Sequence, residues 1–168
     1  MAKSLKKIMG RKIFVDTNAF IYFLTGICNN ITKEIFTFSY LGKIKLITST
    51  RVVDELLFKV MIIKGKEKYG LQNKALEKLK RDKEKIGSLS RECELALEFV
   101  EKAKTEIREV SFKDLKVIPG IMKEFGLFGN DAITIKIMRR FNLKYLLSSD
   151  SDFNDIDGIE VIDPLWET

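Results

Sequence analysis

The chain has 168 residues, of which 45% are hydrophobic and 32% are charged, a composition typical of a soluble globular domain. Thirty lysines and arginines oppose 24 aspartates and glutamates, and this net charge of +6 favours a polyanionic partner. The absence of histidine excludes Ser-His-Asp and Cys-His nucleophile systems, and two cysteines cannot build a structural zinc site. Any hydrolysis must therefore use carboxylates, lysines, hydroxyls or a metal held by oxygen ligands.

The sequence also bears on where the protein works. Cys28 and Cys93 are far apart in the chain and do not form a disulfide framework, which favours a reducing compartment. The basic N-terminal stretch lacks the features of a signal peptide, and no apolar run approaches the roughly 20 residues needed to cross a bilayer. We therefore expect a cytoplasmic protein that does not contact a membrane.

The first half of the chain alternates short apolar runs with helical patterns. The pattern predicts a strand at 13–15, a helix at 19–24 capped by Thr17 or Asn18, a helix at about 31–42, a strand at 44–47, and a mostly buried helix from a Thr50 cap to about 63. Residues 64–85 hold nine basic and four acidic residues and predict a solvated helix surface, with ion pairs such as Glu77–Arg81 and Lys80–Glu84.

The second half continues the same alternation. It predicts a helix capped by Ser90, a strand at 107–110, a helical region that is interrupted at Pro119-Gly120 and resumes at 121–125, a helix at 131–141, and strands at 145–148 and 159–162. Short apolar strands alternating with helices are typical of a parallel sheet that is covered on both faces. The sequence therefore predicts one α/β domain spanning residues 1–168.

Acidic residues stand where predicted strands end and where predicted helices begin. Asp16 follows the first strand and Asp150 follows the strand at 145–148, while Glu55 and Asp131 lie near the starts of helices. Because ligands of open parallel sheets bind at the carboxyl ends of the strands, these four carboxylates should converge there. Clustered carboxylates repel one another and need a cation, and oxygen ligands without histidine favour Mg²⁺ or Mn²⁺. Each acid taken alone also fits a simpler role, such as capping a turn or stabilising a helix dipole.

Four short motifs occur in a consistent order: Ile13-Phe14-Val15-Asp16-Thr17-Asn18; Thr48-Ser49 followed by Glu55; Asn130-Asp131-Ala132; and Ser148-Ser149-Asp150-Ser151-Asp152-Phe153. Together they resemble the PIN-domain nuclease family, which includes VapC-like toxins of toxin–antitoxin pairs. The resemblance covers about residues 12–163, although 64–113 matches no motif. It implies a three-layer α/β/α sandwich with a central, mostly parallel sheet, frequent homodimers, and metal-dependent cleavage of RNA.

The resemblance and the residues together suggest a Mg²⁺- or Mn²⁺-dependent endoribonuclease. Its catalytic carboxylates would hold one or two ions. They are Asp16, Glu55, Asp131 and Asp150. Asp152 is either a further ligand or the cap of a turn. Side chains beside the ligands would be Asn18, which we expect to orient Asp16 or a bound water, and Ser148 and Ser149.

RNA cannot be held by carboxylates alone, so basic residues must contact its phosphates. Arg51 and Lys59 are the candidates nearest the predicted site. The basic run at 64–85 is either a further RNA contact or a solvated helix with paired charges, and the sequence leaves both open.

Several functions remain possible at this stage. A toxin with an antitoxin partner, an RNA-processing nuclease, and a PIN domain that binds RNA without cleaving it all share the same motifs. A phosphotransferase using Asp16 as nucleophile is disfavoured, because Asn18 stands where the second aspartate of an Asp-x-Asp pair would supply the general acid.

Overall fold

The computed structural model describes residues 3–71 and 74–166. Its centre is a five-stranded sheet in the order β3-β2-β1-β4-β5, in which every neighbouring pair is parallel. The strands are β1 (Lys12–Val15), β2 (Lys45–Ser49), β3 (Glu106–Arg108), β4 (Tyr145–Leu147) and β5 (Glu160–Ile162). Ile13 of β1 lies opposite Leu46 on one side and Tyr145 on the other, so β1 is the central strand.

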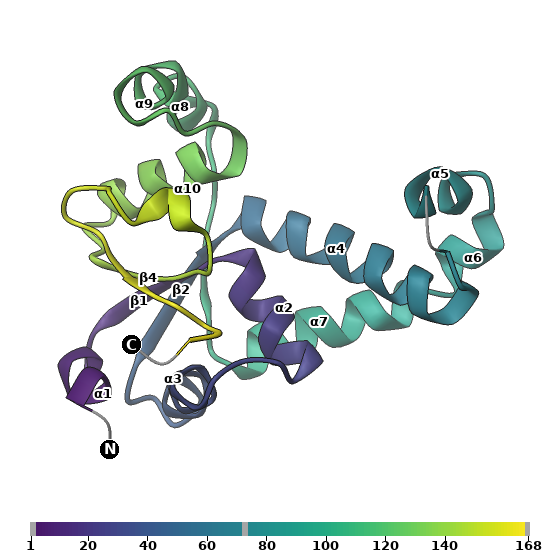
Figure 1. Cartoon of the computed structure of the whole chain (residues 1–168), viewed down its shortest axis with the longest axis horizontal. Coiled ribbons are helices and arrows are strands. Elements are labelled where there is room, and N and C mark those ends of the chain that lie inside the picture. The colour runs from purple at the N-terminus through teal and green to yellow at the C-terminus, as the bar shows by residue number, and fades with distance from the viewer. Residues whose placement is uncertain (1–2, 72–73, 167–168) are drawn as a thin grey trace.

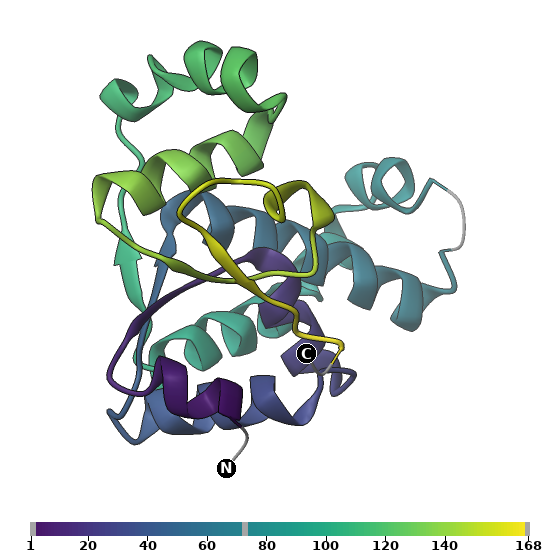
Figure 2. The same ribbon diagram turned by 60° about the vertical axis from the view of Figure 1, so that its left-hand side comes forward.

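Helices cover both faces of this sheet. They are α1 (Lys3–Ile8), α2 (Thr17–Thr25), α3 (Asn30–Tyr40), α4 (Thr50–Tyr69), α5 (Ala75–Lys80), α6 (Lys83–Gly87), α7 (Ser90–Lys102), α8 (Phe112–Leu115), α9 (Ile118–Phe125), α10 (Gly129–Arg140) and the 3-10 turn η1 (Ser151–Phe153). Figures 1 and 2 both show α8, α9 and α10 on the side of the sheet opposite α3 and α7. The predicted α/β/α sandwich with a parallel sheet is thus confirmed.

The main core forms where the apolar strands meet the helices. Ile13, Phe14 and Val15 of β1 are fully buried, as expected for a central strand covered on both faces. On one face, four phenylalanines join α2, α3 and α7, and within this group the rings of Phe23 and Phe99 stack at 4.8 Å. Together, these contacts hold α2, which carries the predicted site residue Asn18, against α3 and α7.

A second, smaller core lies at the far end of α4. Its buried residues are Leu71, Ala75, Leu79 and Leu89, packed against Met61, Ile62 and Tyr69. Figure 1 shows α5 and α6 at this end, projecting away from the sheet. We call the described residues 64–71 and 74–89 the tip.

The predicted helix caps were wrong in three places. Asp16, rather than Thr17 or Asn18, caps α2, and Ser49, rather than Thr50, caps α4. The reason is that an N-cap keeps extended backbone, which the last residues leaving β1 and β2 already have. Ser90 caps nothing, because α7 begins at that residue without a side-chain cap.

Three helices also differ from the sequence prediction. α4 continues to Tyr69 and is buried along one stripe only, since Phe58 is 46% exposed. Pro119 stands within the first turn of α9 instead of interrupting a helix, because the first turn needs no N–H donor there. The N-terminal helix α1 was not predicted. Within the described residues, no helix is both long enough and apolar enough to cross a bilayer.

Candidate active site

The strand order reverses between β1 and β4, and we call the carboxyl edge of the sheet at this point the crevice. From β1 the chain proceeds to β2 on one side, and from β4 it proceeds to β5 on the other, so the topology reverses between these two adjacent strands. In open parallel sheets such a reversal opens a crevice at the carboxyl ends of the strands. Asp16 follows β1 and Asp150 lies three residues after β4, so both lie at this edge.

Asp16 is buried and held by two hydrogen bonds. It is 8% exposed, and its Oδ1 accepts from the backbone N–H of Thr17 at 2.7 Å. Its Oδ2 accepts from the Ser148 hydroxyl at 2.9 Å. Burial raises the pKa of Asp16 above its ordinary value, although the hydrogen bonds from Ser148 and Thr17 oppose that shift. The carboxylate is therefore fixed in position and costly to ionise.

Asp131, in the first turn of α10, is influenced by its burial and by the charges of the other acids. Its pKa rises from 3.8 to about 6, first because it is partly buried and then because of four neighbouring negative charges, those of Asp150, Asp16, Asp152 and Glu55. Nearby negative charges raise the pKa of a carboxyl because they disfavour its ionised form. The four predicted catalytic acids and Asp152 thus share one electrostatic environment, which favours a proton or a cation.

Glu55 is turned toward basic and amide partners. Its Oε1 accepts from Lys59 Nζ at 2.8 Å, one turn further along α4, and its Oε2 accepts from the side-chain amide of Asn130. Lys59 Nζ also donates to Asn18 Oδ1 at 3.2 Å. An ammonium group therefore links Asn18 of α2 to Glu55 of α4.

Asp150 begins the loop that follows β4. The backbone N–H of Asp150 donates to Ser148 Oγ at 3.1 Å, and its own Oδ1 accepts from the Asp152 N–H at 3.0 Å, which caps η1. Ser148 thus connects the two acids that follow β1 and β4. Ser149 lies differently, with its hydroxyl 3.4 Å from that of Tyr22.

The acids are of the right chemical type to bind a divalent cation, but their side chains do not converge on one point. All the candidate donors are carboxylate oxygens, which Mg²⁺ and Mn²⁺ prefer, and a cation would relieve the repulsion that raises the pKa of Asp131. Among the residues that the structure describes, however, no three acidic or cysteine side chains converge closely enough to hold one ion. Binding of an ion by these acids therefore requires some carboxylates to reorient. Glu55 would have to leave its present partners, Lys59 and Asn130.

The structure modifies the roles expected for the neighbouring residues. Asn18 contacts Lys59 rather than Asp16, so its expected role of orienting Asp16 is not seen. Arg51 is engaged by protein groups: its Nε donates to Asn130 Oδ1 at 2.5 Å and its guanidinium pairs with Asp54.

Sequence reasoning missed Asn130 and Tyr22. Asn130 was noted only as part of a motif, yet it lies between Glu55 and Arg51. The position of Asn130 next to Asp131 in the sequence could have indicated its role. Nothing in the sequence indicated the role of Tyr22, because its partner Ser149 is 127 residues away in the chain.

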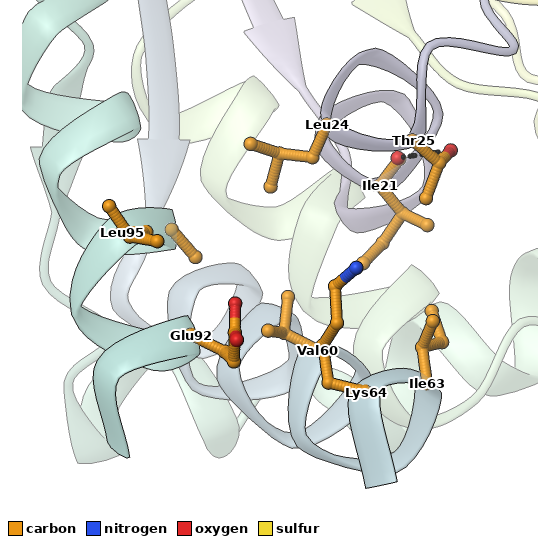
Figure 3. A pocket seen from close by; sticks show the side chains of 9 residues that line it. Ile21, Leu24, Thr25, Val60, Ile63, Lys64, Glu92 and Leu95 are labelled. Atoms are coloured by element: carbon orange, nitrogen blue, oxygen red, sulfur yellow. Dashed lines mark hydrogen bonds between the residues drawn. The ribbon is translucent and has the colours of Figure 1, made fainter. Parts of the chain in front are cut away.

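A separate apolar hollow of about 230 Å³ lies between α2, α4 and α7. Figure 3 shows Ile21 and Leu24 on one side, Val60 and Ile63 on another, and Leu95 across from them. Lys64 and Glu92 also line it, but none of the clustered acids does. The hollow is thus distinct from the carboxylate crevice.

Comparison with known proteins gives three further findings. Ribonuclease VapC6 of Methanocaldococcus jannaschii is 37% identical over 57 residues, which are 34% of this chain and 37% of that protein, so the chain aligns with little more than a third of this relative. The fold is similar to that of VapBC2 from Rickettsia felis bound to a promoter DNA fragment, with TM-score 0.56 and 15% identity, and to a toxin–antitoxin complex from Klebsiella pneumoniae, with TM-score 0.54 and 19% identity. Each match covers 90% of this chain and 97% of the other.

A family model also matches most of the chain. The PIN domain model matches residues 13–159, a range that begins in β1 and includes all four clustered acids. The chain therefore belongs to the PIN domain family.

Proposed function

We propose that this protein is a Mg²⁺- or Mn²⁺-dependent endoribonuclease and the toxin of a toxin–antitoxin pair, working as a single PIN-like domain in the cytoplasm. The observation that carries the proposal is the placement of the acids. Asp16 and Asp150 follow the adjacent strands β1 and β4, where the strand order reverses, and Ser148 bonds to both residues. A ribonuclease among the sequence relatives and toxin–antitoxin complexes among the similar folds support the activity and the antitoxin partner.

The four acids would share the work of holding the ions. Asp16, Glu55, Asp131 and Asp150 are the proposed ligands, with Asp152 as a further candidate. When bound, such ions lower the pKa of water and stabilise the charge that develops on the leaving oxygen. This chemistry replaces the histidine bases that the chain lacks.

Other side chains prepare this crevice. Ser148 holds Asp16 through its hydroxyl and the backbone of Asp150 through its oxygen, so one residue sets the spacing of two acids. Lys59 neutralises Glu55 in the absence of an ion. If Glu55 were to hold a metal, the Lys59 ammonium would be free of this pairing and could contact an RNA phosphate, as could Arg51.

The test uses single-stranded RNA with purified protein. Cleavage is expected with Mn²⁺ and is expected to stop with EDTA or in the Asp16→Asn variant. Asp157→Asn, an exposed aspartate of the C-terminal loop, serves as the matched control and should leave cleavage unchanged. Cleavage that persists in both EDTA and Asp16→Asn would refute the mechanism.

Two further results would redirect the assignment. RNA binding without cleavage under any metal would indicate an assembly domain instead of an enzyme. Growth arrest on expression, relieved by the product of a neighbouring small gene, is expected for a toxin, whereas its absence would favour RNA processing. Analytical ultracentrifugation would test the homodimer that we propose by analogy with the family.

A further inference from the structure

The tip (residues 64–71 and 74–89) holds most of the excess charge of the protein. It has nine basic and four acidic residues, a net of five positive charges out of the six of the whole chain. Its exposed basic side chains are those of Lys66, Lys68, Lys74, Lys78, Lys80, Arg81 and Lys83. The remaining described surface is therefore close to electrically balanced.

The tip is a packed structure rather than a loose loop. Leu79 is fully buried against α4, and an added Cβ at Gly65 would lie 2.8 Å from Leu79 Cδ1, so only glycine permits this approach in its present form. The Tyr69 hydroxyl contacts Ser88 Oγ, which ties the end of α4 to the segment entering α7. Asp82 caps α6 by accepting from the Lys85 N–H at 3.0 Å. The basic side chains are thus presented on a fixed surface.

Internal ion pairs neutralise little of this charge. The predicted pairs Glu77–Arg81 and Lys80–Glu84 are absent from the described residues, which instead pair Lys74 with Glu77 and Lys85 with Asp82. Exposed pairs of this kind contribute little. In the part of the chain that the structure describes, six basic residues of the tip have no carboxylate within 4.0 Å: Lys66, Lys68, Lys78, Lys80, Arg81 and Lys83. Clustered like charges of this kind favour a polyanion.

Helix α4 places this surface at a fixed distance from the acids. Glu55 lies in its second turn and Tyr69 at its end, about 21 Å away at 1.5 Å per residue. Figures 1 and 2 show the tip beyond the sheet at that end. A phosphate bound at the tip therefore belongs to a nucleotide several positions away from any bond held at the crevice.

We propose that the tip is a second RNA-binding surface, which contacts phosphates of single-stranded RNA outside the site of cleavage. The link to cleavage rests on the proposed function, whereas binding of RNA at the tip needs neither metal nor catalysis. RNA is favoured over an acidic protein because evenly spaced phosphates match charges spread over two short helices and the end of α4.

Binding is measured with Asp16→Asn protein in EDTA and a labelled single-stranded RNA long enough to span α4. The tip variant combines Lys78→Gln, Lys80→Gln and Lys83→Gln. Its matched control removes three exposed lysines elsewhere, at Lys33, Lys113 and Lys123, and has the same net charge. If each tip lysine neutralises one phosphate, the slope of log K against log salt falls by about 2, and affinity at about 0.1 M salt falls by up to about 100-fold.

The expected result is a large loss for the tip variant and a small one for the control. Equal losses in both would show that only net charge matters, and no loss in the tip variant would exclude the surface. Tighter binding of a duplex DNA or an acidic polypeptide of equal charge would overturn the assignment to RNA.

Cleavage separates this proposal from the proposed function. With Asp16 intact and Mn²⁺ present, the tip variant should cut a tetranucleotide at the wild-type rate but cut the long RNA with a raised KM. If no RNA is cut but the tip variant still loses binding, the nuclease proposal fails and the tip proposal stands. If the long RNA is cut equally well by the wild type and the tip variant, the tip proposal fails alone.

Discussion

Replacing Asp131 with asparagine should stabilise the protein while removing its activity. The charged form of Asp131 is disfavoured by burial and by four nearby carboxylates. Asparagine has nearly the same shape without the charge, so the repulsion disappears. A side chain whose charge is costly to the fold is the pattern expected at a binding site.

The magnitude follows from the pKa. A rise from 3.8 to about 6 corresponds to about 3 kcal/mol at 1.36 kcal/mol per unit, and solvent screening of this half-exposed group reduces the estimate to about 1.5 kcal/mol. Because the folded pKa is raised, the folded protein loses stability as the pH rises from 3.8 to about 6. The gain from Asp131→Asn should therefore be full above that range and vanish below it.

The assay is urea unfolding in EDTA at about pH 7 and at about pH 3, which lies below both the unfolded and the folded pKa of Asp131, for the wild type, Asp131→Asn and the control Asp157→Asn. We expect the Asp131 variant to be more stable by about 1.5 kcal/mol at the higher pH, equal at the lower pH, and inactive with Mn²⁺. The control should match the wild type throughout. A variant that is equally or less stable at the higher pH would refute the idea that the acids crowd one crevice.

Three further predictions concern other contacts. Ser148→Ala should lower the free energy of unfolding in urea by about 1–3 kcal/mol. It should also raise the pKa of Asp16 further, because the hydrogen bond that lowers it is lost, and so move the acidic limb of the pH profile of cleavage to higher pH. The control Ser148→Thr keeps the hydroxyl and should behave as wild type. Mn²⁺ should raise the melting temperature of the wild type in a concentration-dependent way but raise that of Asp131→Asn less, and equal shifts in calorimetry would argue against a shared ion. Leu79→Ala should cost about 2–5 kcal/mol locally, seen as faster hydrogen exchange in the tip but unchanged exchange in β1, since Leu79 belongs to the smaller core.

Much of the sheet could be predicted because its information is local. The apolar runs of β1, β2 and β4 stand out in the sequence, and each is followed by polar residues at the edge where parallel strands end. The helix caps were harder to predict. The cap is the last residue with extended backbone, and which residue that is depends on where the sheet ends. The small core of the tip was also missed, since Leu71, Leu79 and Leu89 are scattered among charges.

The site shows the same division. The sequence indicated that Asp16 and Asp150 lie at the same edge of the sheet, because each follows a predicted strand and the strands are parallel. The link from Lys59 to Asn18 and the amide of Asn130 on Glu55 join residues 41 and 75 positions apart. No pattern in one sequence specifies such pairs, because the packing of α2, α4 and α10 brings them together.

The central position of β1 sets the order in which the molecule can be assembled during translation. β1 is the earliest strand to leave the ribosome, but one of its two edges stays open until Tyr145–Leu147 has emerged. Asp16 therefore lies beside an incomplete sheet during synthesis, since its hydrogen-bond partner Ser148 is translated more than 130 residues later. A nascent chain has no completed crevice until residue 150 is made, so whatever chemistry the crevice performs is withheld until then.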